Sequence, residues 1–182
     1  MIINKMDTIN WNDIKDIYFE AFPKAERKPF FTLKHAVKKG KAEVYIATDN
    51  DLVIGFIVCY PKEKLVMVDY LAVSNKIRSK GTGSQLLTYI KKIYSDKSIV
   101  LLIEKLDDNA DNQTQRIARR RFYVKNGFES SNIFIDGSSG QMEVLKYGQT
   151  INSSQFLSLF EHVLGTLFYK LSHTRLIQQT AN

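Results

Sequence analysis

The chain has 182 residues, with 44% hydrophobic and 25% charged side chains and a formal net charge of +7 at pH 7, which is typical of one globular domain. No apolar run approaches the roughly 20 residues that cross a bilayer, the first residues lack the features of a secretory signal, and a single cysteine, Cys59, excludes an internal disulfide. We therefore expect a cytoplasmic protein with no membrane partner, and the positive charge suggests an anionic partner.

The first predicted elements are two helices. Apolar residues recur at helical spacing from Trp11 to Ala21, after Asn10 as a candidate cap. Pro23 ends this helix, and the loop "PKAERKP" follows it. A second, shorter helix is expected over residues 33–38 and ends at Gly40.

Three strands are expected next, over residues 42–48, 52–60 and 65–73. Each run is apolar or alternating and rich in β-branched and aromatic residues, and short turn signals separate the runs. This spacing predicts an antiparallel meander.

The second half of the chain continues with alternating elements. We expect a helix from about Thr82 to Tyr94, a buried strand over 98–106, and an arginine-rich helix over 113–125 that ends at "NG". Two further runs, 128–135 and 141–147, read as a closing hairpin. The predicted fold class is therefore mixed α/β (α+β), with a mostly antiparallel central sheet flanked by helices.

The tail from Asn152 onwards carries a separate apolar stripe at helical spacing, formed by Phe156, Phe160, Val163, Leu164, Leu167 and Leu171. We expect an amphipathic C-terminal helix in an extension over 148–182, added to a domain over 1–147. The stripe packs either on its own domain or against a partner, which makes a homodimer through this helix one possibility.

The stretch "KIRSKGTGSQLL", residues 76–87, has two glycines one residue apart at the start of the predicted helix. A dinucleotide fingerprint needs a third glycine where this chain has Leu86. Backbone N–H groups at a helix N-terminus still favour an anion. The alternatives at this point are a phosphate site and a plain turn with solvated basic residues.

Two segments carry a family resemblance. Residues 78–83, "RSKGTG", fit the R/Q-x-x-G-x-G/A motif of the GCN5-related N-acetyltransferases (the GNAT superfamily), and they lie between a strand and a helix as in that family. Residues 119–128, "RRRFYVKNGF", resemble the segment that precedes the family's last strands. The resemblance covers about residues 1–147, and "EAFPKAERKPF" is similar to a bacterial branch of unassigned substrate.

The resemblance implies acetyl-coenzyme A as the cosubstrate. In the family, the glycine loop binds the pyrophosphate and the preceding strand binds the pantetheine arm. The residues to which this carries over are Leu71, Ala72, Val73, Arg78, Ser79, Lys80, Gly81, Thr82, Gly83 and Ser84.

The family's reaction transfers acetyl directly to an amine, which must lose a proton before it attacks. Tyr123 matches the tyrosine that protonates the departing sulfur, with a core aromatic as the alternative reading. Glu104 and Asp69 are the candidates for the base or for orienting the amine. Either carboxylate could instead pair with Arg116, Arg119 or Arg120.

One part of the arginine-rich helix departs from the family. Arg116 stands where many members have an asparagine, and Asn112 lies one turn upstream. Asn112 and Arg119 are accordingly candidates for contacts with the cofactor, and a solvated cationic helix face is the alternative. Glu26 and Arg27, in the proline-bounded loop, are candidates for the acceptor site.

No metal is expected, because the three histidines lack metal-ligand spacing and no Cys/His cluster exists. The predicted function is N-acetyl transfer from acetyl-CoA to a primary amine of a small molecule or peptide. A non-catalytic acyl-CoA sensor on the same fold is the second hypothesis. A nucleic-acid binder is the third and the least favoured, because the basic helix has few aromatics left to stack on bases.

Overall fold

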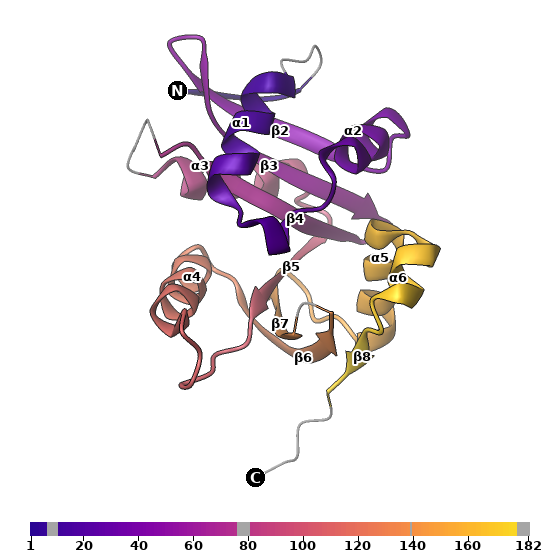
Figure 1. The fold of residues 1–182 in the computed structure, drawn as a ribbon. Helices are drawn as coiled ribbons and strands as arrows, with labels where there is room; N and C mark the ends of the chain where they lie inside the picture. The colour runs from indigo at the N-terminus through magenta and orange to yellow at the C-terminus, as the bar shows by residue number, and fades with distance from the viewer. Residues whose placement is uncertain (7–10, 76–80, 139, 178–182) are drawn as a thin grey trace. The chain divides into compact units, whose positions relative to one another are not determined.

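The computed structural model describes residues 1–6, 11–75, 81–138 and 140–177. The chain forms two compact units (Figure 1). The first comprises Met1–Pro61 and Val68–Ser95, and the second comprises Lys62–Met67 and Asp96–Asn182. The domain boundary predicted at residue 147 stays a prediction.

The first unit contains the predicted helices and meander, preceded by a strand that the sequence did not predict. Its sheet order is β1-β2-β3-β4, and both the β1–β2 and β2–β3 pairs are antiparallel. Its elements are β1 (Ile2–Lys5), α1 (Trp11–Ala21), the 3-10 helix η1 (Lys24–Glu26), α2 (Phe30–Lys38), β2 (Glu43–Asp49), α3 (Thr82–Ile93) and most of β3 (Leu52–Lys62) and β4 (Leu65–Val73). Lys62 of β3 and the first three residues of β4 belong to the second unit.

Helices α1 and α3 each bury one apolar face in this unit. Ile14, Ile17 and Tyr18 are the buried residues of α1. On α3, which packs against β2, the apolar side chains Leu86 and Leu87 are fully buried. Burying such side chains contributes about 1.5–3 kcal/mol each. Asn10, the predicted cap of α1, lies outside the described residues.

The second unit is a four-stranded antiparallel arrangement with three helices among its described residues. Its strand order is β5-β7-β6-β8. Its elements are β5 (Ser98–Glu104), α4 (Gln113–Lys125), β6 (Glu129–Gly137), β7 (Gly140–Tyr147), α5 (Ser153–Leu164), α6 (Thr166–Leu171) and β8 (Arg175–Leu176). The mixed α/β class and the mostly antiparallel pairing are confirmed.

The C-terminal amphipathic helix is present as α5, which begins with a capping box between Asn152 and Gln155. Its residues Phe156, Leu159 and Val163 are buried. The stripe does not continue as one helix, because Gly165 has φ +78° and the chain starts again as α6.

The apolar side chains of α6 are exposed, among them Leu167 and Leu171 at 67% and 61%. The homodimer expected through this region stays a prediction. Within the described ranges, no helix has both the length and the apolar character that a membrane span requires.

Candidate functional site

The turn from β4 into α3 is built on a glycine. Gly81 is the residue before α3 and has φ +103° and ψ −2°, a left-handed conformation that side chains disfavour. In the part of the chain that the structure describes, no side chain caps this helix end. Gly81 therefore provides no side-chain cap of its own for α3, and the first-turn N–H groups of a helix are the kind of donors that bind an anion.

Part of the predicted glycine motif cannot be placed. Arg78, Ser79 and Lys80 lie outside the described residues. Thr82 is buried, while Gly81 is exposed and Gly83 is half-buried. Solvent therefore reaches both glycines among the described residues of the motif.

A second glycine fixes the distance between strands at this turn. A Cβ added to Gly55 on β3 would lie 2.8 Å from the carbonyl oxygen of Ala72 and 3.4 Å from Cγ2 of Thr82. Only a glycine allows the two backbones to come so close. The lack of a side chain at Gly55 lets the end of β4 lie close against β3, next to the start of α3.

Side chains alternate along the end of β4, as they do in any strand. Tyr70 and Ala72 are buried, whereas Asp69, Leu71 and Val73 are partly exposed. Asp69 therefore lies in phase with two of the three residues predicted to bind the pantetheine arm.

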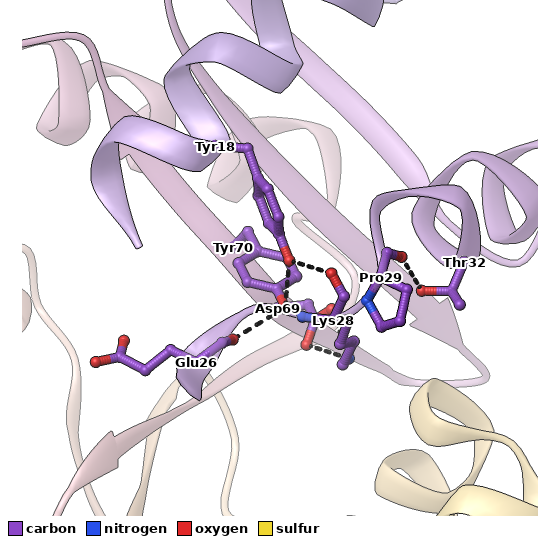
Figure 2. Close-up of polar contacts among 7 residues, drawn as sticks. All are labelled: Tyr18, Glu26, Lys28, Pro29, Thr32, Asp69 and Tyr70. Carbon is purple, nitrogen blue, oxygen red and sulfur yellow. Dashed lines mark hydrogen bonds and ion pairs between the residues drawn. The ribbon is translucent and has the colours of Figure 1, made fainter. Parts of the chain in front are cut away.

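Asp69 binds a lysine from the proline-bounded loop. The Nζ of Lys28 donates to Oδ1 of Asp69 at 2.8 Å and to Oδ2 at 2.7 Å (Figure 2). The side chains are 14% exposed for Asp69 and 30% for Lys28. No sequence pattern pointed to Lys28, because its partner Asp69 lies far away in the chain and the two meet only in the folded protein.

Two tyrosines fix the backbone of Lys28. Its N–H donates to the Tyr70 hydroxyl at 3.1 Å, and its carbonyl accepts from the Tyr18 hydroxyl at 2.9 Å (Figure 2). Burial raises the pKa of Tyr70, and the charge of Asp69 raises it further. Burial is also the main cause of the raised pKa of Tyr18. Both phenols therefore stay protonated and can serve as hydrogen-bond donors.

The two predicted acceptor-site residues precede Lys28 directly. Glu26 is exposed, and its carbonyl lies 3.4 Å from the Tyr70 hydroxyl (Figure 2). The guanidinium of Arg27 lies over the ring of Phe19, 4.7 Å from its centre. This loop is thus ordered by contacts with α1 and β4.

Glu104 ends β5 in the second unit and is surrounded by donors. Asn112 donates to its Oε1 at 2.8 Å, and Arg119 donates to its Oε2 at 2.8 Å. Arg116 lies 3.5 Å from Oε1 and donates to the Asn112 side chain at 2.7 Å. Of the two roles that the sequence left open, pairing with arginines is therefore the one observed for Glu104.

Arg120, on the same helix, pairs with a buried carboxylate on β7. Its Nε and Nη2 donate to the two oxygens of Glu143 at 3.1 and 3.2 Å. Asn112 and Arg119, predicted as cofactor contacts, are thus engaged with Glu104, as is Arg116. Three arginines of α4 thus pair with two carboxylates inside their own unit.

Tyr123 is half-buried near the end of α4. Its ring packs edge-on against Phe122 and Phe128, with centroid distances of 5.1 and 5.8 Å. Burial raises the pKa of Tyr123 to about 12, although the nearby charge of Arg119 acts in the opposite direction. The phenol is therefore protonated at neutral pH, as a general acid must be.

The predicted site residues fall into two groups. The first unit brings together Asp69, the end of β4, the start of α3 and the Glu26–Arg27 loop. The second unit brings together Glu104, Asn112 and Arg119, with Tyr123 one helical turn further on. The described residues include no group of His, Cys, Asp or Glu side chains that could hold a metal.

Cys59 has no accessible surface, and burial raises its thiol pKa well above the ordinary value. A thiol in that state is not a nucleophile. Cys59 is thus a small buried side chain of β3, in agreement with the apolar run that contains it.

Several solved structures resemble this one. A putative GNAT-family acetyltransferase from Bacteroides thetaiotaomicron is 20% identical over 93% of this chain and 98% of its own, with a TM-score of 0.66. The aminoglycoside 6'-N-acetyltransferase from Enterococcus faecium is 18% identical over 80% and 96%, with a TM-score of 0.63. A Bacillus subtilis acetyltransferase in complex with CoA is 17% identical over 81% and 97%, with a TM-score of 0.61.

At these identities the structures share the fold with this chain. No curated protein matches the sequence closely enough to count as a relative. The family model described as "Acetyltransferase (GNAT) domain" matches residues 40–130, which include the β4–α3 glycine turn and helix α4. The match spans half of the 182 residues, and the chain belongs to the GNAT acetyltransferase family.

Proposed function

We propose that this protein is an acetyl-CoA-dependent N-acetyltransferase that acts on a primary amine of a small molecule or peptide. The observation that carries the proposal is the left-handed Gly81 at the start of α3, inside the region that matches the acetyltransferase domain. The CoA complex of the B. subtilis protein of the same fold supports the choice of cofactor.

The cofactor would bind along β4 and at the start of α3. Backbone N–H groups of Gly81 to Ser84 would donate to the pyrophosphate, whose charge the helix dipole favours. The backbone of Leu71 to Val73 would bind the pantetheine arm. Arg78, Ser79 and Lys80 complete the motif and remain part of the proposal from the sequence alone. For Asn112 and Arg119 to bind the cofactor through the same groups, their present hydrogen bonds to Glu104 would have to break.

The cofactor supplies a thioester whose acetyl group can pass to an amine. Between the two candidate bases, the surroundings favour Asp69. The two oxygens of Glu104 accept from Asn112 and Arg119, and Arg116 lies 3.5 Å from one of them; neither the amide nor an arginine holds a removable proton at neutral pH. Asp69 is instead bound by an ammonium group. An acceptor amine would present the same kind of group to Asp69 before it loses its proton. Tyr123 is the proposed acid for the departing sulfur.

The acceptor would bind beside the loop of Glu26 and Arg27, which lies next to Asp69. The neighbour of the same fold that is named an aminoglycoside 6'-N-acetyltransferase supports an amine acceptor for this chain. The structural relatives leave the acceptor itself open.

The test is thiol release from acetyl-CoA against a panel of amines, in the presence of the wild-type protein and of Tyr123→Phe. Turnover with one acceptor, reduced in the variant, is the expected result. Tight CoA binding without turnover on any amine would instead favour an acyl-CoA sensor. A mobility shift of nucleic acid that disappears with salt would favour the basic-surface alternative.

A further inference from the structure

The Asp69 carboxylate, which we propose as the base for the acceptor amine, is already bound by an amine of this protein. Lys28 Nζ bonds both oxygens of Asp69, at 2.8 and 2.7 Å. A primary ammonium held in this way is the arrangement from which a base removes a proton. The lysine is 30% exposed, so it is not sealed in the core.

The surroundings of this amine suit an ammonium group. Nζ lies 5.8 Å from the ring centre of Tyr60 and 5.8 Å from that of Tyr70. Electron-rich ring faces attract a cation at this range. Asp69 and these two rings form an ammonium site within the first unit, and the chain's own lysine fills it.

The same strand connects this site with the proposed place of the thioester. Asp69 and Leu71 are two residues apart on one side of β4, which separates them by about 7 Å along the strand. Leu71 starts the backbone segment proposed to bind the pantetheine arm. The Lys28 side chain has four rotatable methylene groups, so its amine can cover this distance once it leaves Asp69.

We propose that Lys28 is an internal acetyl acceptor, acetylated at Nζ by the chain that carries it, with Asp69 receiving its proton. This inference rests on the proposed function, because the acetyl donor is acetyl-CoA. The fixed backbone of Lys28, bonded to Tyr18 and Tyr70, keeps the amine close to its base.

The Lys28 ammonium gives one proton to Asp69, and the free lone pair attacks the carbonyl carbon of the thioester. A C–N bond forms, the C–S bond breaks, and the thiolate leaves with the bonding pair. The nitrogen loses its second proton, one proton ends on the sulfur, and the other passes to solvent.

Acetylation would end the Lys28–Asp69 ion pair, because an amide nitrogen carries no charge. Asp69 would then be free of its internal partner. Acetylation of Lys28 would thus expose an external amine to an Asp69 carboxylate that no longer pairs with Lys28.

The test is a labelling time course with the full chain and acetyl-CoA in the absence of other amines. Peptide mass spectrometry would compare Lys28 with Lys64, whose side chain is 82% exposed and reports chemical acetylation. We expect Lys28 to be labelled first, at a rate that does not depend on protein concentration. Asp69→Asn should slow Lys28 labelling about 100-fold and leave Lys64 unchanged.

Lys28→Arg is the matched variant, because it retains the positive charge and removes the acceptor amine. It should lose the fast acetyl group without a change in its melting temperature. Labelling of Lys28 no faster than that of Lys64, or a rate that rises with protein concentration, overturns the inference. A CoA titration on the same samples separates the two claims. If CoA binds but Lys28 is not labelled first, only this inference fails; if CoA does not bind, the proposed function fails as well.

Discussion

Arg119 and Asn112 donate to opposite oxygens of Glu104, each at 2.8 Å. These bonds join the end of β5 to one position of α4 and to its N-cap residue. Glu104 was one of two carboxylates that the sequence offered as a base, and its partners make it a structural link in its unit.

The two carboxylates should therefore respond differently to loss of charge. We predict that Asp69→Asn lowers kcat for an acceptor amine about 100-fold or more, because the proton has no base to receive it. Glu104→Gln should lower stability by about 1–3 kcal/mol, because its arginines lose a charged partner. Steady-state kinetics and denaturant unfolding on both variants measure this. A larger kcat loss in Glu104→Gln than in Asp69→Asn would reverse the assignment.

Tyr123→Phe should reduce turnover while CoA affinity stays unchanged, since only the departing sulfur needs the phenol proton. The expected loss is about 100-fold. Because the pKa of Tyr123 is raised to about 12, its proton is retained at lower pH. The wild-type rate should therefore show no alkaline decline from this group until the pH approaches that value. A pH–rate profile checks this, and equal rates for both proteins would remove Tyr123 from the mechanism.

Arg120→Ala should destabilise the protein. Glu143 is buried at 4% exposure, and both of its oxygens accept from Arg120. Loss of the guanidinium leaves that carboxylate without this partner, at an expected cost of about 1–3 kcal/mol. The neighbouring Arg121 is exposed, so Arg121→Ala is the control and should change stability by about 0.5 kcal/mol at most. Urea unfolding that ranks the two variants equally would contradict the role of the ion pair.

Stability should fall at alkaline pH because of the buried tyrosines. Burial raises the pKa of Tyr60, Tyr70 and Tyr94 in the folded chain. In the unfolded chain these phenols ionise near pH 10. Above about pH 10 the folded state binds more protons than the unfolded state, so the free energy of unfolding decreases as the pH rises.

Circular dichroism and phenolate absorbance, followed together through an alkaline titration, check this. The buried tyrosines should ionise only as the fold is lost. Full ionisation near pH 10 with the secondary structure intact would show that these groups are not held by burial.

Much of the fold could be predicted from local patterns. The alternation along 42–73 located the meander, and the polar helix over 113–125 agrees with α4 because "NG" ends it at a favourable position. Strand β1 was missed because Ile2–Lys5 is mostly exposed and gains its regular structure from pairing with β2. The break at Gly165 was missed because the apolar spacing continues through it.

The candidate site could be predicted only where its residues lie in one motif. Gly81 and Tyr123 belong to recognisable segments of sequence. Lys28 has no such signal, because its role arises from a contact with Asp69 that forms only in the folded chain. Pairing of Glu104 with an arginine was one of the alternatives that the sequence left open. The Arg120–Glu143 pair had no such signal, because it depends on a strand elsewhere in the sequence.

The most direct test of the account is the melting temperature of the wild-type chain with and without coenzyme A. A ligand that binds only the folded state at about 100 times its Kd stabilises it by about 2.7 kcal/mol. We predict a saturable rise in the melting temperature that is weakened by replacing Gly81. An unchanged melting temperature at saturating coenzyme A would contradict the claim that this chain is an acetyl-CoA-dependent transferase.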